Sequence, residues 1–328
     1  MVNRRAKLSA ICFVAVLVLL CFALNLSFGP VQIPLPRIWA VLKGSEKGGA
    51  MAQIVWQLRL PRALAAMFVG MGLAAAGTIL QAVMQNPLAA PSLIGVNSGA
   101  GLAAMIIFAY QPQRLYLLVP TAFLGAMLAL TLILVIAFSS RGGRMGLILA
   151  GIAISALLGA GVDTLRLLHP EALLGATSFM IGGFVATAWS SLRFALPWLG
   201  AALTLSLLIG PVLNVLSLGD DVARSLGVPI GSVRHALLAL AAILAGSSVA
   251  IAGLLSFVGL IVPHAARLIW VDDQLWLLPG AILLGGSFVL ACDLIARLLF
   301  APYELPVGIL LSFIGGPFFI YVLVKNKE

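Results

Sequence analysis

Long apolar runs constrain this chain more than any other feature, because a water-soluble domain of 328 residues cannot bury so much apolar surface. Hydrophobic residues make up 62% of the sequence and charged residues only 9%, and the mean hydropathy is +1.16. A membrane-spanning helix needs about 20 apolar residues, so the chain has room for about ten such helices. We therefore expect an all-α, polytopic membrane protein with short loops.

The apolar runs predict ten spans and one short helix between them. The segment 171–185 is expected to form a surface or half-buried helix, and the span near 258–270 is unusually short for a crossing. The predicted spans are about 8–28, 62–83, 93–109, 115–138, 145–168, 193–215, 236–255, 258–270, 275–299 and 306–324.

The distribution of basic residues predicts the orientation of the chain. Its net charge of +9 is better explained by basic cytoplasmic loops than by nucleic-acid binding. Placing the N-terminus in the cytoplasm puts Arg4, Arg5 and Lys7 inside, together with the segment 216–229 and the C-terminus. The apolar run near the N-terminus is expected to be a retained first helix rather than a removed signal peptide.

Five arginines remain outside in this orientation, namely Arg37, Arg59, Arg62, Arg114 and Arg297, and three of them are placed where a particular role can be considered. Arg59 and Arg62 lie three residues apart on one helical face, and Arg297 lies near the outer end of another span. They are either arginines that snorkel to the membrane interface or a docking site for an acidic partner. Arg297 is also expected to pair with Asp293, four residues earlier.

The segment "LSLGDDVARSLGVP" predicts a short cytoplasmic helix within 216–229. Asp220 and Asp221 suit its N-terminal end, Gly227 can end it in a left-handed conformation, and Pro229 blocks its continuation. Such a helix is either a capped connector or a surface that contacts something in the cytoplasm. The residues that would make this contact are Leu218, Gly219, Asp220, Asp221, Ala223, Arg224, Ser225, Leu226 and Gly227.

Polar residues and helix breakers inside spans suggest where the bundle interior lies. Asp163 and Arg166 share a helical face, and Asn97 and Ser98 lie where a helix begins, so all four are candidates for a translocation path. The alternative for the first two is an internal ion pair. Interruptions are expected at Gly253, at Gly259–Pro263 and at Gly315–Pro317. Proline removes a backbone hydrogen bond, and broken helices must face protein or water.

Several functions have no supporting motif in the sequence. The chain has no G-x-x-x-x-G-K-[ST] phosphate-binding loop, so any ATP would be bound by another chain. Its three cysteines have no metal-ligand spacing, and no residues pair a nucleophile with a base. The scarcity of carboxylates in the spans also argues against a proton-coupled carrier.

Taken together, the motifs resemble the FecCD-type permease family, which contains BtuC-like type II ABC importer permeases. The motifs in question are "RLPR", "ILQAVMQNPLAAPSLIGVNSGA", "LGDDVARSLGV", "FVGLIVPHAARL", "LLPGAILLGG" and "ELPVGILLSFIGGPFF". The resemblance implies a bacterial inner-membrane permease that is not itself an enzyme and binds no cofactor. It also implies a second permease copy, two cytoplasmic ATPase subunits that use ATP, and an extracytoplasmic binding protein.

The resemblance also assigns roles to particular residues. It implies that Arg59, Arg62 and Arg297 face glutamates of the binding protein, and that the 218–228 segment is a coupling helix for the ATPase. The implied substrate is an iron chelate, either a siderophore or haem, and cobalamin is the alternative within the family. An ion-coupled secondary transporter is the alternative from another class.

Overall fold

The computed structural model describes residues 4–45, 49–139, 143–300 and 303–325, and no β-strand occurs within these ranges. The first part of the chain forms helices α1 (Arg4–Ser27), α2 (Leu35–Leu42), α3 (Ala50–Gln53), a π-helix (Ile54–Arg59), α4 (Leu60–Met84), a 3₁₀ turn (Pro91–Ile94), α5 (Val96–Tyr110), a second 3₁₀ turn (Leu115–Leu117) and α6 (Leu118–Ser139). The remainder forms α7 (Gly143–Leu168), α8 (Ala172–Ile181), α9 (Trp189–Ser206), α10 (Gly210–Ser217), α11 (Asp220–Ser225), α12 (Ile230–Ala252), α13 (Val258–Trp270), α14 (Gln274–Leu298) and α15 (Val307–Lys325).

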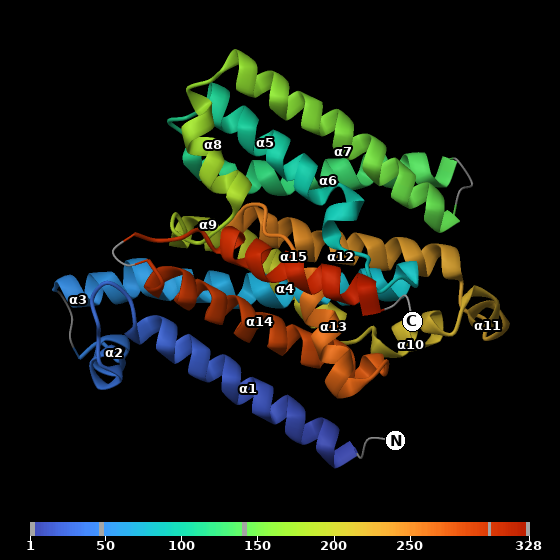
Figure 1. Cartoon of the computed structure of the whole chain (residues 1–328), viewed down its shortest axis with the longest axis horizontal. Helices are drawn as coiled ribbons and strands as arrows, with labels where there is room; N and C mark the ends of the chain where they lie inside the picture. Colours follow the sequence, from blue (N-terminus) through green and yellow to red (C-terminus); the bar gives the residue numbers. More distant parts are fainter. Residues whose placement is uncertain (1–3, 46–48, 140–142, 301–302, 326–328) are drawn as a thin grey trace.

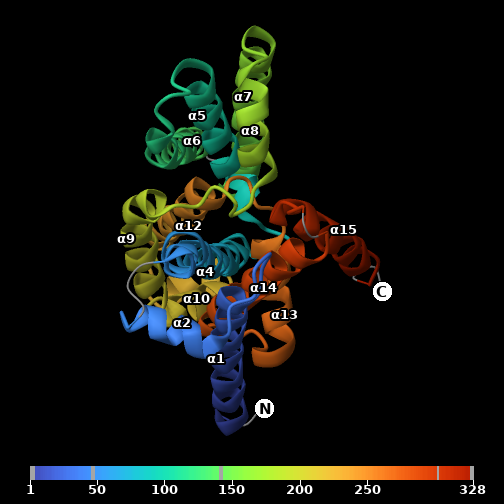
Figure 2. The ribbon, with the colours of Figure 1, turned by 90° about the vertical axis from the view of Figure 1, so that its left-hand side faces the viewer.

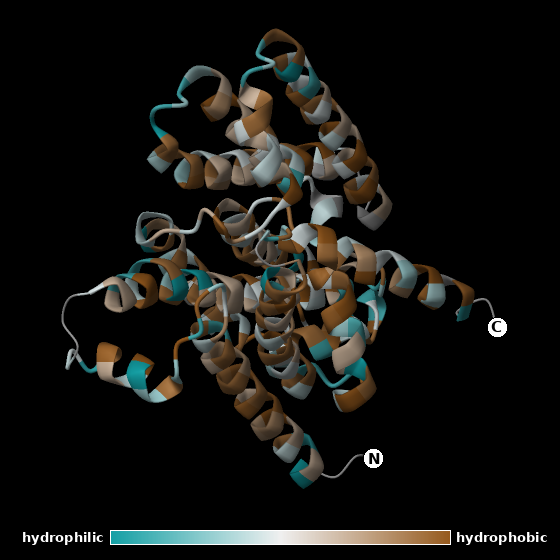
Figure 3. Ribbon diagram, turned by 60° about the vertical axis from the view of Figure 1, so that its left-hand side comes forward, coloured by the Kyte–Doolittle hydropathy of each residue, from teal (hydrophilic) through white to brown (hydrophobic). Residues whose placement is uncertain are grey.

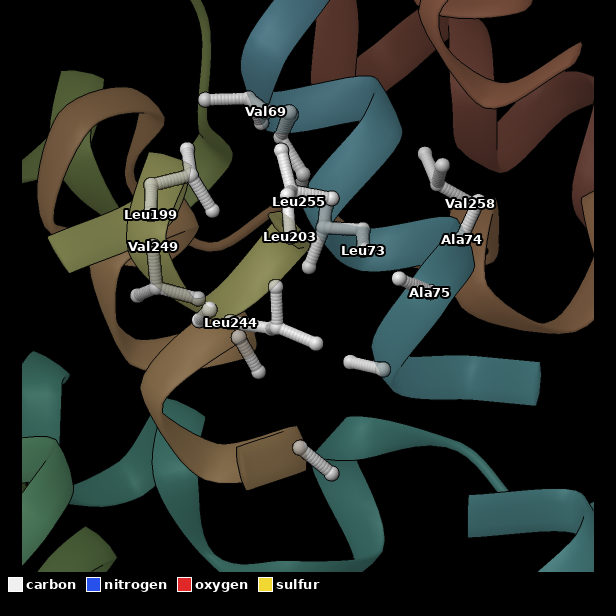
Figure 4. Packing of buried hydrophobic residues seen from close by; sticks show 14 of the residues in the cluster. Val69, Leu73, Ala74, Ala75, Leu199, Leu203, Leu244, Val249, Leu255 and Val258 are labelled. Atoms are coloured by element: carbon white, nitrogen blue, oxygen red, sulfur yellow. The ribbon is translucent and has the colours of Figure 1, made fainter. Parts of the chain in front are cut away.

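Helix α4 lies at the centre of one group of helices, where it contacts α1, α9, α12, α13 and α14. Helices α5 to α8 form a second group, and α12 lies between the two groups (Figures 1 and 2). Apolar side chains from α4, α9 and α12 meet in the first group, where Leu73, Leu199 and Leu244 are buried close together (Figure 4). The central position of α4 makes its two ends natural places for functional residues.

Glycines allow α4 to approach its neighbours closely. A Cβ atom on Gly70 would overlap the carbonyl oxygen of Gly285 in α14, and one on Gly77 would overlap that of Gly259 in α13. Small-residue contacts of this kind are typical of helices that pack inside membranes. The small residues around Gly70 thus mark a tight contact between α4 and α14.

Each predicted span contains a helix, but two of them differ from the prediction. Within the described residues, six helices are long and apolar enough to cross a membrane, and the pair α9 and α10 forms a seventh candidate that is bent by 60°. The span predicted at 193–215 therefore corresponds to a bent pair, because Gly210 and Pro211 begin a new helix. The span predicted from residue 62 instead begins at Ala50. The segment near 171–185 forms the short helix α8, as expected.

The predicted interruptions at Gly259–Pro263 and Gly315–Pro317 are wrong, since α13 and α15 continue through them. The carbonyl of Gly259, which Pro263 leaves without its usual helical donor, accepts a hydrogen bond from the side-chain amide of Gln81 (3.4 Å). The interruption expected at Gly253 is confirmed, because α12 ends at Ala252 and the non-helical loop 253–257 follows, in which Gly253 and Phe257 both have positive φ angles (72° and 67°). A buried amide from another helix thus replaces the bond that the proline removes.

The two ends of the molecule are formed by different elements (Figure 1). Helix α11 and both chain termini lie at one end, whereas α2, α3 and the start of α4 lie at the other. Hydrophilic residues gather mainly at helix ends and turns, while the helix bodies are largely hydrophobic (Figure 3). This is the distribution expected of a protein that spans a membrane.

Candidate functional site

The three arginines of the sequence analysis lie together at the α2–α3 end, around a buried carboxylate. Arg62 binds Asp293 with a 2.9 Å contact from Nη2 to Oδ1, and its Nη1 donates to Glu304 Oε2 at 2.7 Å. Arg297 Nε lies 3.3 Å from Asp293 Oδ2, which confirms the expected pair four residues apart. Asp293 is completely buried, so both cations are held against a carboxylate shielded from water.

Arg59 has a different kind of partner from the other two arginines. Its guanidinium donates to the carbonyl oxygens of Leu26 (2.5 Å) and Ser27 (2.9 Å), and also to that of Val31. Leu26 and Ser27 end α1, where backbone carbonyls have no intrahelical donor and the helix dipole is negative. Arg59 therefore caps α1 and joins it to the start of α4.

A widened helical turn places these arginines. The π-helix Ile54–Arg59 directly precedes Pro61, which has no N–H to donate to the preceding turn. The carbonyl of Trp56 in that turn instead accepts a hydrogen bond from Trp189 Nε1 at 2.7 Å. Pro61 lies in the first turn of α4, and the π-helix and α3 extend the same span back to Ala50.

The arginine cluster borders a recess of about 320 Å³, which we call the arginine recess. It is lined by Arg59, Arg62, Arg297 and Glu304, and by apolar residues that include Val31 and Phe184. Arg59 and Arg297 are only 6% and 5% exposed. They are thus interior side chains with internal partners rather than arginines that snorkel freely at the surface. Three arginines face two carboxylates here, which leaves one positive charge in excess.

The short helix predicted within 216–229 is present as α11. Residues 218–227 are hereafter called the coupling segment, after the role that the resemblance implies for them. Gly219 and Gly227 have φ angles of 104° and 79°, so left-handed glycines bound the helix as expected at its C-terminal end. Ala223 is buried, whereas Leu218, Val222 and Leu226 are exposed. Val222 lies in α11, while Leu218 precedes the helix and Leu226 follows it, so the segment presents three exposed apolar side chains, hereafter called the apolar stripe.

The polar residues of the coupling segment have separate positions. Asp220 accepts two hydrogen bonds of 3.0 Å from Arg234 of α12. Asp221 and Arg224 are fully solvated, with a loose 3.8 Å contact, while Ser225 bonds only within its own helix turn in the contacts recorded. The segment is therefore attached on its inner side and open on its outer side.

The four candidate path residues do not form one cluster. Arg166 binds Asp163 at 3.1 Å on an exposed face of α7, which confirms the ion pair that the sequence suggested. Asn97 and Ser98 lie in the first turn of α5 and are partly buried. Gly161 of α7 faces Leu102 of α5. Leu102 is five residues after Asn97, which corresponds to about 7 Å along the helix. Asp163, two residues after Gly161, therefore belongs to a different level of the bundle from Asn97.

A larger recess of about 450 Å³ lies between the two groups of helices and contains polar groups. It is lined by Met180 and Ile181 of α8, Leu254 and Ser256 of the loop 253–257, and Gly308, Ile309, Ser312 and Phe313 of α15. His264, in α13, packs edge-on against Phe318 of α15 with ring centroids 5.4 Å apart, as expected of a packing residue. Among the described residues, no group of three His, Cys, Asp or Glu side chains could hold a metal ion.

The geometry agrees with comparisons to known proteins. The model of the FecCD transport family matches residues 17–325. The chain belongs to the FecCD transport family. The chain is 38% identical to the hemin transport system permease protein HmuU of Yersinia pestis. The match covers 96% of this chain and 95% of HmuU. The vitamin B12 import system permease protein BtuC of Yersinia pseudotuberculosis is 35% identical over 94% and 91%.

A solved structure gives the same result for the fold of this FecCD family member. A protein described as a metal-chelate type ABC transporter, in an inward-facing conformation, superimposes with a TM-score of 0.86. It is 30% identical in sequence, and the match covers 96% of this chain and 98% of the other. The chain is therefore an all-helical membrane protein with the fold of an ABC importer permease.

Sequence reasoning missed several polar residues that organise this FecCD permease. Asn25 accepts a hydrogen bond from Arg297 Nη2 at 2.5 Å and donates to the carbonyl of Leu290. Gln81 and Asn214 likewise link helices far apart in the sequence. A lone amide inside a long apolar run was the available signal, because an unpaired polar group in hydrocarbon is costly.

Proposed function

We propose that this chain is the transmembrane permease subunit of an ABC importer that takes up an iron chelate. The observation that carries the proposal is the fold match over nearly the whole length of a metal-chelate type ABC transporter. Relatives named for haem, iron(III)-citrate and vitamin B12 transport support the same class of importer. We favour a ferric siderophore or haem as substrate, and cobalamin is the second candidate.

The coupling segment is the proposed contact with a cytoplasmic ATPase. Its exposed leucines give a partner an apolar stripe at the end of the molecule where both termini lie. Energy from ATP would reach this chain there, since the sequence has no phosphate-binding loop. This proposal places α11 and both termini in the cytoplasm.

The arginine recess is the proposed contact with an extracytoplasmic binding protein. It lies at the opposite end from α11 and carries one excess positive charge beside Arg59. A carboxylate on the partner would enter the recess and approach Arg62. In the chain alone, Arg62 donates a hydrogen bond to Glu304 at the edge of the recess. Complementary charges of this kind favour both orientation and rapid association.

A second copy of the chain is the proposed cover for the recess between α8 and α15. The loop 253–257 is not helical, and non-helical backbone at membrane depth is tolerated only against protein or water. Ser256 and Ser312 face the same space. Two permease copies meeting at this face would enclose a central pathway lined by these polar groups.

Reconstitution in liposomes tests the function directly. The permease is purified with a cognate ATPase and binding protein, and uptake of radiolabelled ferric citrate, haem and cobalamin is measured with and without ATP. We expect uptake of one of these compounds only with ATP and both partners. Uptake by the permease alone, driven by an ion gradient, would instead support a secondary transporter.

A variant of the coupling segment tests the ATPase contact in the same system. We expect Leu226→Asp to weaken ATPase association and to reduce uptake, because it places a charge in the apolar stripe. Leu226→Met keeps an apolar side chain of similar size and is expected to preserve both. Equal ATPase binding by the two variants would argue against this contact.

A further inference from the structure

Four elements at the coupling-segment end are joined by a closed path, in which side-chain hydrogen bonds alternate with short stretches of backbone. From α4, Gln85 Nε2 donates to the carbonyl of Leu216 in α10 (2.7 Å). One turn earlier in α4, Gln81 accepts a hydrogen bond from Arg267 of α13. These two bonds connect α10 to α4 and α4 to α13.

The ring closes through the turn between α13 and α14. Arg267 Nε donates to Asp272 Oδ1 (3.1 Å), and the next residue, Asp273, accepts from Asn214 Nδ2 of α10 (3.1 Å). Asn214 Oδ1 in turn accepts from the backbone N–H of Gln274 (2.7 Å). Because Asn214 and Leu216 both belong to α10, the path returns to the helix where it began. We call these contacts the polar ring.

Burial and backbone strain indicate that the polar ring is tightly constrained. Gln81 is only 2% exposed, so its amide is placed inside the bundle at a desolvation cost that both of its hydrogen bonds offset. Gln85 and Val271 are non-glycine residues with positive φ angles, of 49° and 58°. Strained conformations of this kind, especially in a β-branched residue, persist only where the surroundings enforce them.

The polar ring lies between the coupling segment and the recess at α15. Leu216 precedes the coupling segment by two residues, so the ring holds the base of that segment. Arg267 lies near the far end of α13, whose 13 residues extend about 20 Å to the loop 253–257. At that loop Phe257 packs against Gly315 of α15, and Ser256 lines the recess. Helix α13 is continuous, so it can move as a rod.

We propose that the polar ring makes α10, α4 and α13 move as one body, and that Gln81 and Arg267 are positioning residues which couple motion of the coupling segment to the recess at α15. The inference rests on the proposed function, since it assumes that force reaches the coupling segment from an ATPase. The ring is distinct from the apolar stripe itself, because its side chains contact other helices of this chain.

The test compares uptake with ATP hydrolysis in the reconstituted transporter. We expect Gln81→Leu and Arg267→Met to lower the amount of substrate carried per ATP hydrolysed by about tenfold, with ATP hydrolysis retained. Thr78→Val is the matched control, because Thr78 is buried one turn earlier in α4 and its hydroxyl bonds to Ala74 of its own helix. It should leave the ratio unchanged.

Asp272→Ala keeps the proposal testable if the buried variants fold poorly. Asp272 is 76% exposed, so its loss should not impair folding, yet it opens the polar ring at Arg267. We expect a smaller fall in substrate carried per ATP and faster hydrogen exchange in 210–227 of the permease alone in nanodiscs. An unchanged ratio together with unchanged exchange would overturn the inference.

The wild-type measurements separate this inference from the function on which it rests. Uptake by the wild type that needs no ATP would contradict the proposed function, and the coupling role would fall with it. ATP-dependent wild-type uptake with an unaltered ratio in all three ring variants would overturn the polar ring alone.

Discussion

Two carboxylates share the arginine cluster, but their surroundings differ. Asp293 has no exposed surface and contacts both Arg62 and Arg297. Glu304 is 27% exposed and forms an ion pair with Arg62. Removing one partner from a buried ion pair usually costs about 3–5 kcal/mol, while a pair near the surface contributes far less. Asp293 is therefore needed for folding, and Glu304 is free to exchange with an external carboxylate.

Glu304→Gln should strengthen docking at the arginine recess. The variant removes the internal charge that competes for Arg62, so we expect the binding protein to bind up to about fivefold more tightly. Surface plasmon resonance with the permease in nanodiscs measures this affinity. Asp293→Asn is the comparison, for which we expect a lower yield of folded protein. Weaker docking by Glu304→Gln would contradict the proposed entry of a carboxylate.

The stability of the turn before α14 should depend on pH through Asp273. Burial raises the pKa of Asp273, but hydrogen bonds from Asn214 and Lys7 lower it more, so the pKa lies below its ordinary value. The stabilising contribution is therefore complete above the ordinary aspartate pKa of about 3.9, and it is lost as the pH falls through the lowered value. We expect Asp273→Asn to unfold at a lower temperature than the wild type near neutral pH.

The same comparison at acidic pH provides the control. Thermal unfolding of both proteins is measured in detergent from pH 7 down to about pH 3, and the difference should shrink below about pH 4. A constant difference over this range would show that the Asp273 charge has no such role.

At the scale of elements, the contacts of α4 depend on glycines that bring backbones together. Gly70 meets Gly285 of α14, and Gly77 meets Gly259 of α13. Such contacts let neighbouring helices pack without side chains between them, which matters in a membrane where lipid is as apolar as the helices. The position of Gln81, one turn after Gly77, follows from this close approach.

Gly77→Ala should separate α4 from α13. The added methyl group would overlap backbone atoms of Gly259, which cannot move aside as a flexible side chain could. We expect a clear loss of folded protein, measured by fluorescence-detected size-exclusion chromatography. Gly200→Ala in α9 is the control, because nothing lies within 4 Å of the added Cβ. It should be neutral or stabilising by about 1 kcal/mol, and equal losses in both variants would contradict the packing argument.

Apolar patterning predicted which segments are helical, but not where proline ends a helix. Pro263 and Pro317 suggested interruptions, yet α13 and α15 continue, and Pro61 lies inside a continuous helix. For Pro61 and Pro263, a tryptophan or glutamine from a distant helix contacts the neighbouring backbone. Local sequence cannot contain that information, because the donor lies more than 100 residues away.

The functional clusters could be predicted only in part for a similar reason. Sequence motifs drew attention to Arg59, Arg62, Arg297 and the coupling segment, and the roles of these residues stay predictions. They did not reveal that the arginines are buried, because burial depends on Asn25 and Asp293 from other helices. The polar ring was missed altogether, since its members are single polar residues spread over several helices.

At the scale of the whole molecule, one face of the chain carries a recess with polar groups. The recess of about 450 Å³ combines serine side chains with a non-helical loop, and Phe313 beside it is 72% exposed. Another part of the surface is formed by α1, whose exposed side chains after Ser9 are mostly apolar, including Phe13 and Leu19, and suit contact with lipid. The two faces therefore differ in chemistry, which agrees with a second copy at the first face.

Phe313→Ser should weaken the proposed dimer. We expect purified wild-type permease to have the mass of two chains in native mass spectrometry, and the variant to shift toward one, because an apolar anchor is lost. Phe13→Ser is the matched control in α1, where Phe13 is 69% exposed. A wild-type mass of one chain, or identical masses for both variants, would contradict the assigned face.

The widened turn before Pro61 also has a practical consequence. The indole of Trp189 is bonded to the carbonyl of Trp56, three residues before Arg59. That indole is consequently an intrinsic optical sensor beside the arginine recess, since tryptophan emission responds to the loss or gain of a hydrogen bond. In a variant that keeps Trp189 as its single tryptophan, arrival of a soluble partner at this end can be followed by fluorescence, without attaching a dye.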